Sequence, residues 1–175
     1  MVPNVAEPLR PLLVPLASVH RNPANTRQHP LRNIEVIKAS LARFGQRKPI
    51  VVQKEGMVVR AGNGMHQAAE ELGWDSIAAL VVDEAAVEAA AFEIVDNRSS
   101  EASCWNDPAL AAQLQALRDS QVSIEGLGFD EDEFADLLAR CKPQPPPEEF
   151  GEVDEHAETQ YRCPMCGHEW NGQPR

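Results

Sequence analysis

Apolar residues recur every three or four positions between residues 33 and 44, with charged residues between them. This spacing predicts a helix with one apolar face, which Asn33 can cap at its start and Gly45 can end. Residues 49–52 and 57–61 are short runs rich in β-branched side chains around a Glu-Gly turn, and they predict a β-hairpin. Helical and strand patterns therefore alternate in this part of the chain.

Further short elements flank the helix and the hairpin. Strands are predicted over residues 14–19 and 77–82, and a second helix over residues 67–72. A helix, a hairpin, a helix and a strand are enough to enclose one small core. We therefore expect an α+β domain, a short mixed sheet with helices, over residues 1–83.

The second half of the chain is helical, acidic and then rich in proline. Helices are predicted over residues 85–95, 108–117 and 130–139. Asn106 or Asp107 can cap the second, and acidic residues in the first turn of the third suit the helix dipole. A run of prolines and glutamates after residue 142 is typical of a stiff linker. We expect four parts: the domain over 1–83, a helical extension over 84–142, a Pro-rich acidic linker over 143–160 and a small tail over 161–175.

Charge divides the chain unevenly. Residues 1–75 carry ten Lys or Arg against six Asp or Glu, whereas residues 76–175 carry six against 21. Residues 20–60 alone hold nine basic and two acidic side chains. A local cationic excess attracts phosphate, and an acidic segment repels DNA or binds a basic partner. Ordinary solvated surface charge is the alternative for each segment.

A glycine-rich turn, Gly62-Asn63-Gly64, lies between a predicted strand and a predicted helix. Glycines let the backbone turn sharply and approach a ligand, and the N–H groups at the start of the helix point to the same place. The turn can therefore hold a phosphate, although tight structural turns use the same pattern more often. It is not a P-loop, because no Gly-Lys-Ser/Thr follows.

The order of these motifs resembles that of ParB-like domains. The resemblance spans about residues 13–83 and is carried by the segments Pro15–Pro23, Ile34–Leu41, Phe44–Val52 and Ala61–Trp74. It implies a ParB/sulfiredoxin-like fold with a nucleotide or phosphate site between the Gly-Gln-x-x-Pro-Ile segment and the glycine-rich turn. It implies that role for Gly45, Gln46, Lys48, Pro49, Gly62, Asn63, Gly64 and His66. The candidates for DNA contact are the arginines of the cationic segment: Arg21, Arg27, Arg43 and Arg47.

The glycine-rich turn departs from both well-known patterns of this fold. Partition ParB proteins carry Gly-Glu-Arg-Arg where this chain has Gly62–Met65, so we do not expect CTP hydrolysis of their kind. Sulfiredoxins carry Gly-Cys-His-Arg where this chain has Gly64–Gln67. The thioether of Met65 cannot replace their nucleophilic thiolate, which excludes their chemistry.

Two later segments, Asp96–Glu101 and Ile124–Asp130, are similar to one branch of ParB-like proteins. In that branch the domain accompanies DNA methyltransferases in phages and other mobile elements. The sequence shows no Asp-Pro-Pro-Tyr-like motif and no second glycine-rich cofactor loop, so we expect the accessory domain without the enzyme. The resemblance names a DNA methyltransferase, or another mobile-element protein, as a candidate partner beside DNA.

The C-terminal tail contains a Cys-Pro-x-Cys-Gly knuckle, at Cys163 and Cys166. Two thiolates at this spacing can bind one face of a tetrahedral zinc ion, which needs four ligands in a structural site. His168 and His156 are the candidates within the tail, Cys141 is a further one, and a second copy of the chain in a homodimer is another source. Free thiols in a vestigial half-ribbon are the alternative.

No apolar run is long enough to span a membrane and no secretory signal is visible, so we expect a cytoplasmic protein. The sequence favours an accessory protein that binds a nucleotide, DNA or both. One alternative is an enzyme of the same fold, a nuclease, NTPase or small-molecule kinase, with His66 as its acid–base candidate. The other is a pure interaction protein whose acidic helices dock a basic partner.

Overall fold

The computed structural model describes residues 3–142 and 161–170. The chain divides into two units, residues 1–142 and 143–175. The predicted linker over 143–160 lies outside the described residues. None of the described helices is long and apolar enough to cross a membrane.

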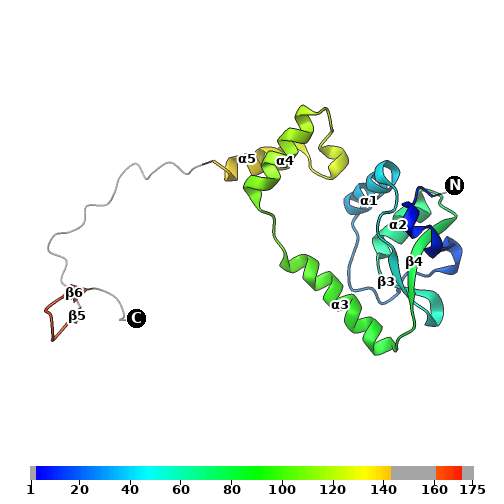
Figure 1. Ribbon diagram of the computed structural model, residues 1–175, viewed down its shortest axis with the longest axis horizontal. Helices are drawn as coiled ribbons and strands as arrows, with labels where there is room; N and C mark the ends of the chain where they lie inside the picture. Colours follow the sequence, from blue (N-terminus) through cyan, green and yellow to red (C-terminus); the bar gives the residue numbers. More distant parts are fainter. Residues whose placement is uncertain (1–2, 143–160, 171–175) are drawn as a thin grey trace. The chain divides into compact units, whose positions relative to one another are not determined.

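A four-stranded mixed sheet forms the centre of the first unit (Figure 1). Its strands are β1 (Leu13–Pro15), β2 (Ile50–Gln53), β3 (Val58–Ala61) and β4 (Ser76–Val82), in the order β1-β4-β2-β3. β2 and β4 are parallel, whereas β2–β3 and β1–β4 are antiparallel. The sheet is thus a hairpin extended by one parallel and one antiparallel neighbour, which confirms the predicted α+β class.

Two helices, α1 (Leu31–Phe44) and α2 (Asn63–Glu71), pack against each other and share a core with the sheet. Their apolar faces and the inner side chains of the strands are almost fully buried. The core includes Ile34 and Leu41 of α1, Ala68 and Ala69 of α2, and Ile50, Val52, Val59, Ile77 and Ala78 of the sheet. Aliphatic residues and alanine therefore fill the core, as the low aromatic content requires.

Several predicted boundaries differ from the structure, and α2 begins at Asn63 instead of residue 67. α1 begins at Leu31, with Pro30 at its N-cap, and Asn33 instead accepts a hydrogen bond from the His29 ring at 2.8 Å. The predicted strand over 14–19 ends at Pro15 and continues as a 3₁₀ turn over Leu16–Ser18. Leu16 and Val19 are both buried. Residues three apart lie on the same side of a 3₁₀ turn but on opposite faces of a strand, so only the turn buries both.

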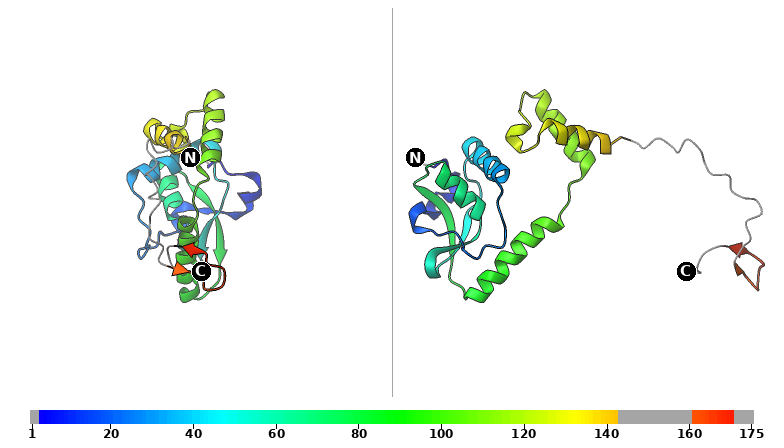
Figure 2. Two further views of the ribbon diagram at one scale, coloured as in Figure 1. Left: turned by 90° about the vertical axis from the view of Figure 1, so that its left-hand side faces the viewer. Right: turned by 180° about the vertical axis from the view of Figure 1, so that it is seen from behind.

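The acidic second half of the first unit consists of α3 (Ala86–Ala102), α4 (Asp107–Asp119) and α5 (Glu131–Arg140). Figures 1 and 2 show α3 leaving the end of β4 as one continuous helix that extends past the predicted end at residue 95. α4 and α5 enclose a second small core of Ala111, Leu114, Ile124, Phe134 and Leu137. Asn106 caps α4, and Asp130 forms a capping box with Glu133 at the start of α5.

The α4–α5 pair contacts α1. Arg32 of α1 forms ion pairs with Asp130 and Glu133. Gly128, which has a φ of 91°, approaches so closely that a Cβ there would lie 3.0 Å from Cγ1 of Val36. The predicted helical extension therefore belongs to the same compact unit as the α+β domain.

The described part of the second unit is a short hairpin. β5 (Tyr161–Arg162) pairs antiparallel with β6 (Glu169–Trp170). Tyr161 stacks on Trp170, with ring centroids 5.8 Å apart. None of its described residues is fully buried, so the hairpin encloses no core.

Candidate functional site

The glycine-rich turn lies where β3 passes into α2. Gly62 has a φ of 96°, and a Cβ there would lie 2.6 Å from Cγ2 of Ile50. A Cβ on Gly64 would lie 2.9 Å from the ring of His29. Close packing therefore requires glycine at both positions: Gly62 packs against β2, and Gly64 packs against the loop over residues 21–29. Gly62 is also the N-cap of α2 and provides no side chain to satisfy the first N–H groups of the helix.

A polar hollow of about 430 Å³ lies between this turn and the loop over residues 21–29. Its lining contains cationic and amide side chains but no carboxylate: Arg21, Asn22, Pro23, Asn25, Arg27, His29, Asn63 and Gln67. We call it the loop pocket. The positive side chains and the N-terminal end of α2 both favour an anion at this place.

Asparagine side chains fix the shape of the loop. The side chain of Asn63 accepts a hydrogen bond from the backbone N–H of Asn22 at 3.1 Å, which attaches the loop to α2. Within the loop, the Asn22 and Asn25 side chains accept from the N–H groups of Ala24 and Arg27. The pocket is therefore held by hydrogen bonds within the loop and to the turn, so little reorganisation is needed to bind a ligand.

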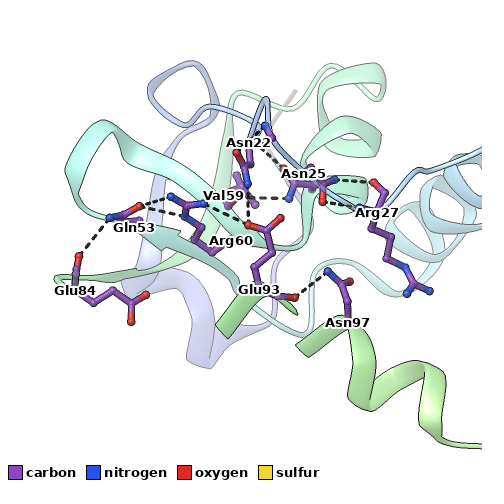
Figure 3. A network of polar contacts seen from close by, with 11 residues as sticks. Asn22, Asn25, Arg27, Gln53, Val59, Arg60, Glu84, Glu93 and Asn97 are labelled. Atoms are coloured by element: carbon purple, nitrogen blue, oxygen red, sulfur yellow. Dashed lines mark hydrogen bonds and ion pairs between the residues drawn. The ribbon is translucent and has the colours of Figure 1, made fainter. Parts of the chain in front are cut away.

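A buried ionic network supports the loop from beneath (Figure 3). Asn22 Nδ2 donates to Oε2 of Glu93 at 2.8 Å, and Nη1 of Arg60 lies 3.4 Å from the same oxygen. Arg60 also donates twice to Oε1 of Gln53. Glu93 is only 4% exposed, although it belongs to the outer helix α3. The carboxylate of Glu93 thus joins α3, β3 and the loop in one place.

The sequence alone did not predict a site role for Asn22, Arg60 and Glu93. One signal was present, since Ala89 and Glu93 are four residues apart and so lie on the same face of the helix. They are also the two buried residues of α3. A glutamate at the buried stripe of a helix needs a cation or several hydrogen-bond donors, and Arg60 and Asn22 supply these.

The residues before β2 lie elsewhere than the loop pocket. Gly45, Lys48, Arg47 and Phe44 border a separate, mostly apolar hollow of about 430 Å³ beside Met65. Gly45 has a φ of 71°, and a Cβ there would lie 2.5 Å from the carbonyl oxygen of Asn4. Among the residues predicted to share one site, Gly45 and Lys48 therefore line one hollow, and Asn63 lines another.

Gln46 is fully buried and its polar atoms are occupied. Its Oε1 accepts from the N–H of Ala78 at 2.7 Å, while its Nε2 donates to the carbonyl of Ala78 at 2.8 Å and to that of Lys48 at 3.0 Å. The side-chain amide thus continues the hydrogen bonding of β4 on its β2 side, next to the start of β2. Pro49 comes directly before this strand. The structure gives Gln46 a structural role, and a ligand contact for it stays a prediction.

His66 faces the interior of the protein. Its ring is 5% exposed, and Nε2 lies 3.1 Å from the carbonyl oxygen of Val19. Burial lowers the pKa of His66 below its ordinary value, because desolvation disfavours the charged imidazolium and outweighs the nearby Glu70 carboxylate. A neutral buried ring that does not line the loop pocket is poorly placed for acid–base catalysis there.

The four arginines predicted to contact DNA separate into two pairs. Arg21 and Arg27 line the loop pocket, where they also form ion pairs with Glu70 and Glu101 at 3.3 and 2.8 Å. Arg43 and Arg47 lie over the ring of Phe44, at the end of α1. The structure therefore offers two cationic areas instead of one continuous stripe.

Cys163 and Cys166 lie on the turn of the β5–β6 hairpin. The N–H groups of Met165 and Cys166 donate hydrogen bonds to the Cys163 sulfur and lower the pKa of this thiol below its ordinary value. The ring of His168 stacks on Trp170, with centroids 6.2 Å apart. Within residues 3–142 and 161–170, no three Cys, His, Asp or Glu side chains are grouped as metal ligands. His156 lies outside the described residues.

Comparisons with known proteins agree with the fold. A family model described as the ParB-methyltransferase HTH domain matches residues 108–165. No curated protein sequence matches the chain. The crystal structure of C-terminally truncated chromosome-partitioning protein ParB from Caulobacter crescentus, complexed with CTP-gamma-S, has a TM-score of 0.60 and 19% identity, over 72% of this chain and 75% of that one.

Two further structures are similar over parts of the chain. The same Caulobacter crescentus protein complexed to the centromeric parS site has a TM-score of 0.42 and 18% identity, over 72% of this chain and 69% of that one. Sulfiredoxin from Arabidopsis thaliana has a TM-score of 0.39 and 22% identity, over 48% of this chain and 98% of that one. Together with the sheet and helices described above, the match to the CTP-gamma-S complex shows that this chain has a ParB-like α+β fold.

Proposed function

We propose that residues 3–142 bind a nucleotide and that the loop pocket receives its phosphate groups. The single observation that carries this proposal is the lining of the pocket, which combines cations and amides with the start of α2 and contains no carboxylate. Phosphate oxygens accept hydrogen bonds and need donors of this kind. The structurally similar ParB of Caulobacter crescentus binds CTP-gamma-S, which supports a nucleotide as the phosphate carrier.

The shape of the site favours a nucleotide over DNA as its first ligand. The loop pocket is concave, and its two arginines are already paired with single carboxylates, so a compact polyphosphate can exchange places with those partners. DNA requires a longer cationic surface. The described α5 begins with Glu131, Asp132 and Glu133, and such an acidic helix does not suit the major groove.

DNA binding is the second candidate function, favoured by the two cationic areas of the first unit. It would use Arg43 and Arg47 together with Arg21 and Arg27, and would weaken steeply with salt. The match to a ParB-methyltransferase HTH domain supports a role as an accessory factor in DNA modification, for a phage or other mobile element. In that role the acidic α4–α5 pair would bind a methyltransferase or another basic partner inside the cytoplasm.

An enzyme of this fold has less support. The buried, neutral His66 does not line the loop pocket. The described residues also lack a grouped set of carboxylates, histidines or cysteines that would hold a catalytic metal. We therefore propose binding without turnover in the loop pocket.

Zinc binding by Cys163 and Cys166 is a separate proposal for the second unit. The two thiols share one tight turn, and backbone N–H groups donate to the Cys163 sulfur. These features are those of a metal-binding knuckle, in which thiolates need such hydrogen bonds.

Equilibrium dialysis of the full chain against CTP, ATP, GTP, UTP and inorganic triphosphate tests the nucleotide proposal. We expect Arg27→Gln to weaken binding by about tenfold. The substitution removes a charge-assisted hydrogen bond to the ligand, whose net contribution is ~1.4 kcal/mol because the arginine gives up its exposed ion pair when it binds. Arg10→Gln is the matched control, because Arg10 is exposed and lies outside the pocket. No binding of any of these anions at low salt would overturn the proposal.

A further inference from the structure

The Cys163–Cys166 turn has a defined geometry. The hairpin pairs Tyr161 with Trp170 and Arg162 with Glu169. Its turn is closed by hydrogen bonds from the Cys163 N–H to the His168 carbonyl at 2.7 Å and from the Gly167 N–H to the Cys163 carbonyl at 2.9 Å. Gly167 has a φ of 76°, which glycine adopts without strain. Both cysteines therefore sit on one short, internally bonded loop.

The hairpin itself lacks the means to be stable alone. It has two strands of two residues each, and none of its described side chains is fully buried. Isolated two-stranded hairpins are marginal in water, and a module this small usually requires a disulfide, a metal or association. Cys163 and Cys166 are free thiols. An internally bonded turn that presents two thiols and has no core points to a bound metal as the missing source of stability.

One described chain supplies only part of a closed zinc site. A structural zinc ion takes four ligands, and the described residues contain no group of three. The His168 ring is stacked on Trp170. Cys141 packs beside the small core of α4 and α5 in the other unit, and Cys104 is exposed on that unit. Each chain thus offers a pair of thiolates on a single turn.

We infer that two copies of this chain share one zinc ion, each supplying Cys163 and Cys166 to a four-thiolate site. This rests on the proposal that the knuckle binds zinc. Thiols on one tight turn occupy one side of a tetrahedron and leave the opposite side open to an identical pair. A zinc ion with four thiolates is anionic, and the Arg162 guanidinium lies near the turn, at 3.8 Å from the position of a Cβ on Gly167. Its Nε also lies 3.7 Å from Glu169, an exposed pair that the arginine can exchange for the zinc site. An arginine from each chain would offset that charge.

A shared zinc would link two nucleotide-binding units. The Pro-rich segment over residues 143–160 separates the knuckle from the first unit in the sequence. Two tethered units bind a repeated ligand such as duplex DNA with higher avidity than either one does alone. Dimer formation would depend on metal and not on the loop pocket.

Native mass spectrometry of the full chain, purified under reducing conditions, tests the inference. The protein is stripped with a chelator and then titrated with zinc chloride, while mass and metal content are followed together. We expect monomer without zinc, and a dimer that contains one zinc ion per two chains when zinc is added. Reducing conditions exclude a dimer linked by disulfides. Cobalt(II) in place of zinc should show the visible and sulfur charge-transfer absorption of a tetrahedral thiolate site.

Three variants make the result specific. Cys163→Ser should abolish both zinc binding and the dimer, while the exposed Cys104→Ser should change neither. His168→Ala should leave the ratio of one zinc to two chains unchanged. The circular dichroism of Cys163→Ser should remain that of the folded first unit.

The possible outcomes separate the two proposals. A monomer that holds one zinc ion would overturn the shared site and leave zinc binding in place. Loss of zinc in His168→Ala would overturn the four-thiolate assignment. Absence of zinc from the reduced chain at a saturating concentration would overturn both.

Discussion

The side-chain amide of Gln46 offers the sharpest test of how the sheet is built. Gln46 is fully buried and hydrogen-bonds both the N–H and the carbonyl of Ala78, itself fully buried in β4. Gln46→Met keeps the length of the side chain and removes both bonds to Ala78, together with the bond to the Lys48 carbonyl. Leaving the buried Ala78 N–H without an acceptor costs about 1–3 kcal/mol, and loss of the bonds to the carbonyls of Ala78 and Lys48 costs about 1 kcal/mol each.

The methionine recovers part of this cost. Burial of its larger apolar surface at the same place stabilises the folded state by about 1 kcal/mol. We therefore expect Gln46→Met to lower the free energy of unfolding by about 3 kcal/mol. Urea denaturation followed by far-UV circular dichroism measures it, because the midpoint shifts while the slope stays the same.

The matched control is Gln113→Met, at an exposed position of α4. It should change the free energy of unfolding by less than ~0.5 kcal/mol, as surface substitutions usually do. A loss for Gln46→Met that is no larger than this control would refute the structural role. Nucleotide binding by folded Gln46→Met should be close to that of the wild type, since Gln46 does not line the loop pocket.

Three further predictions concern the pocket and its support. Gly64→Val should weaken nucleotide binding by more than about tenfold, because its side chain displaces His29 from the pocket wall. Gly126→Ala should not, because a Cβ there would make only an ordinary contact with Nη1 of Arg43 at 4.0 Å, and isothermal titration calorimetry compares the two variants. Glu93→Ala should destabilise the first unit by about 3 kcal/mol, because the mostly buried Arg60 loses its ion-pair partner. Hydrogen exchange should show early opening of α3, and equal exchange in wild type and variant would contradict this. Burial lowers the folded-state pKa of His66, so the unfolded chain takes up the proton first and the free energy of unfolding should fall as the pH drops below about 6.5. Urea titrations should show a smaller fall for His66→Gln than for the wild type, and an unchanged fall for the exposed His20→Gln.

Local patterns were enough to predict most of the fold. The hairpin, α1, α2 and β4 each carry the periodicity or the β-branched composition of their class, and Gly45 marked the end of α1 correctly. The errors arose where tertiary burial decides between two local structures. Residues 14–19 have the composition of a strand, yet Leu16 and Val19 are buried by a 3₁₀ turn.

The site was harder to predict because its parts come from distant segments. Asn22, Arg60 and Glu93 meet through the sheet and α3, and no spacing in the sequence relates them. The resemblance to ParB-like domains placed Gln46 and Asn63 at one site. In the structure, Gln46 hydrogen-bonds the backbone of β4, whereas Asn63 lines the loop pocket. A polar residue beside a turn has the same sequence signal whether it binds a ligand or completes a sheet.

The most direct test of the nucleotide proposal is a titration of the ¹⁵N-labelled chain with CTP, followed in amide NMR spectra. We expect the largest shifts on the N–H groups of Gly62, Asn63 and Gly64 and on the loop over residues 21–29. Smaller shifts should reach α3 through Asn22 and Glu93, which are hydrogen-bonded. Shifts confined to the hollow around Phe44 and Lys48, or no shifts with saturating nucleotide, would contradict the account.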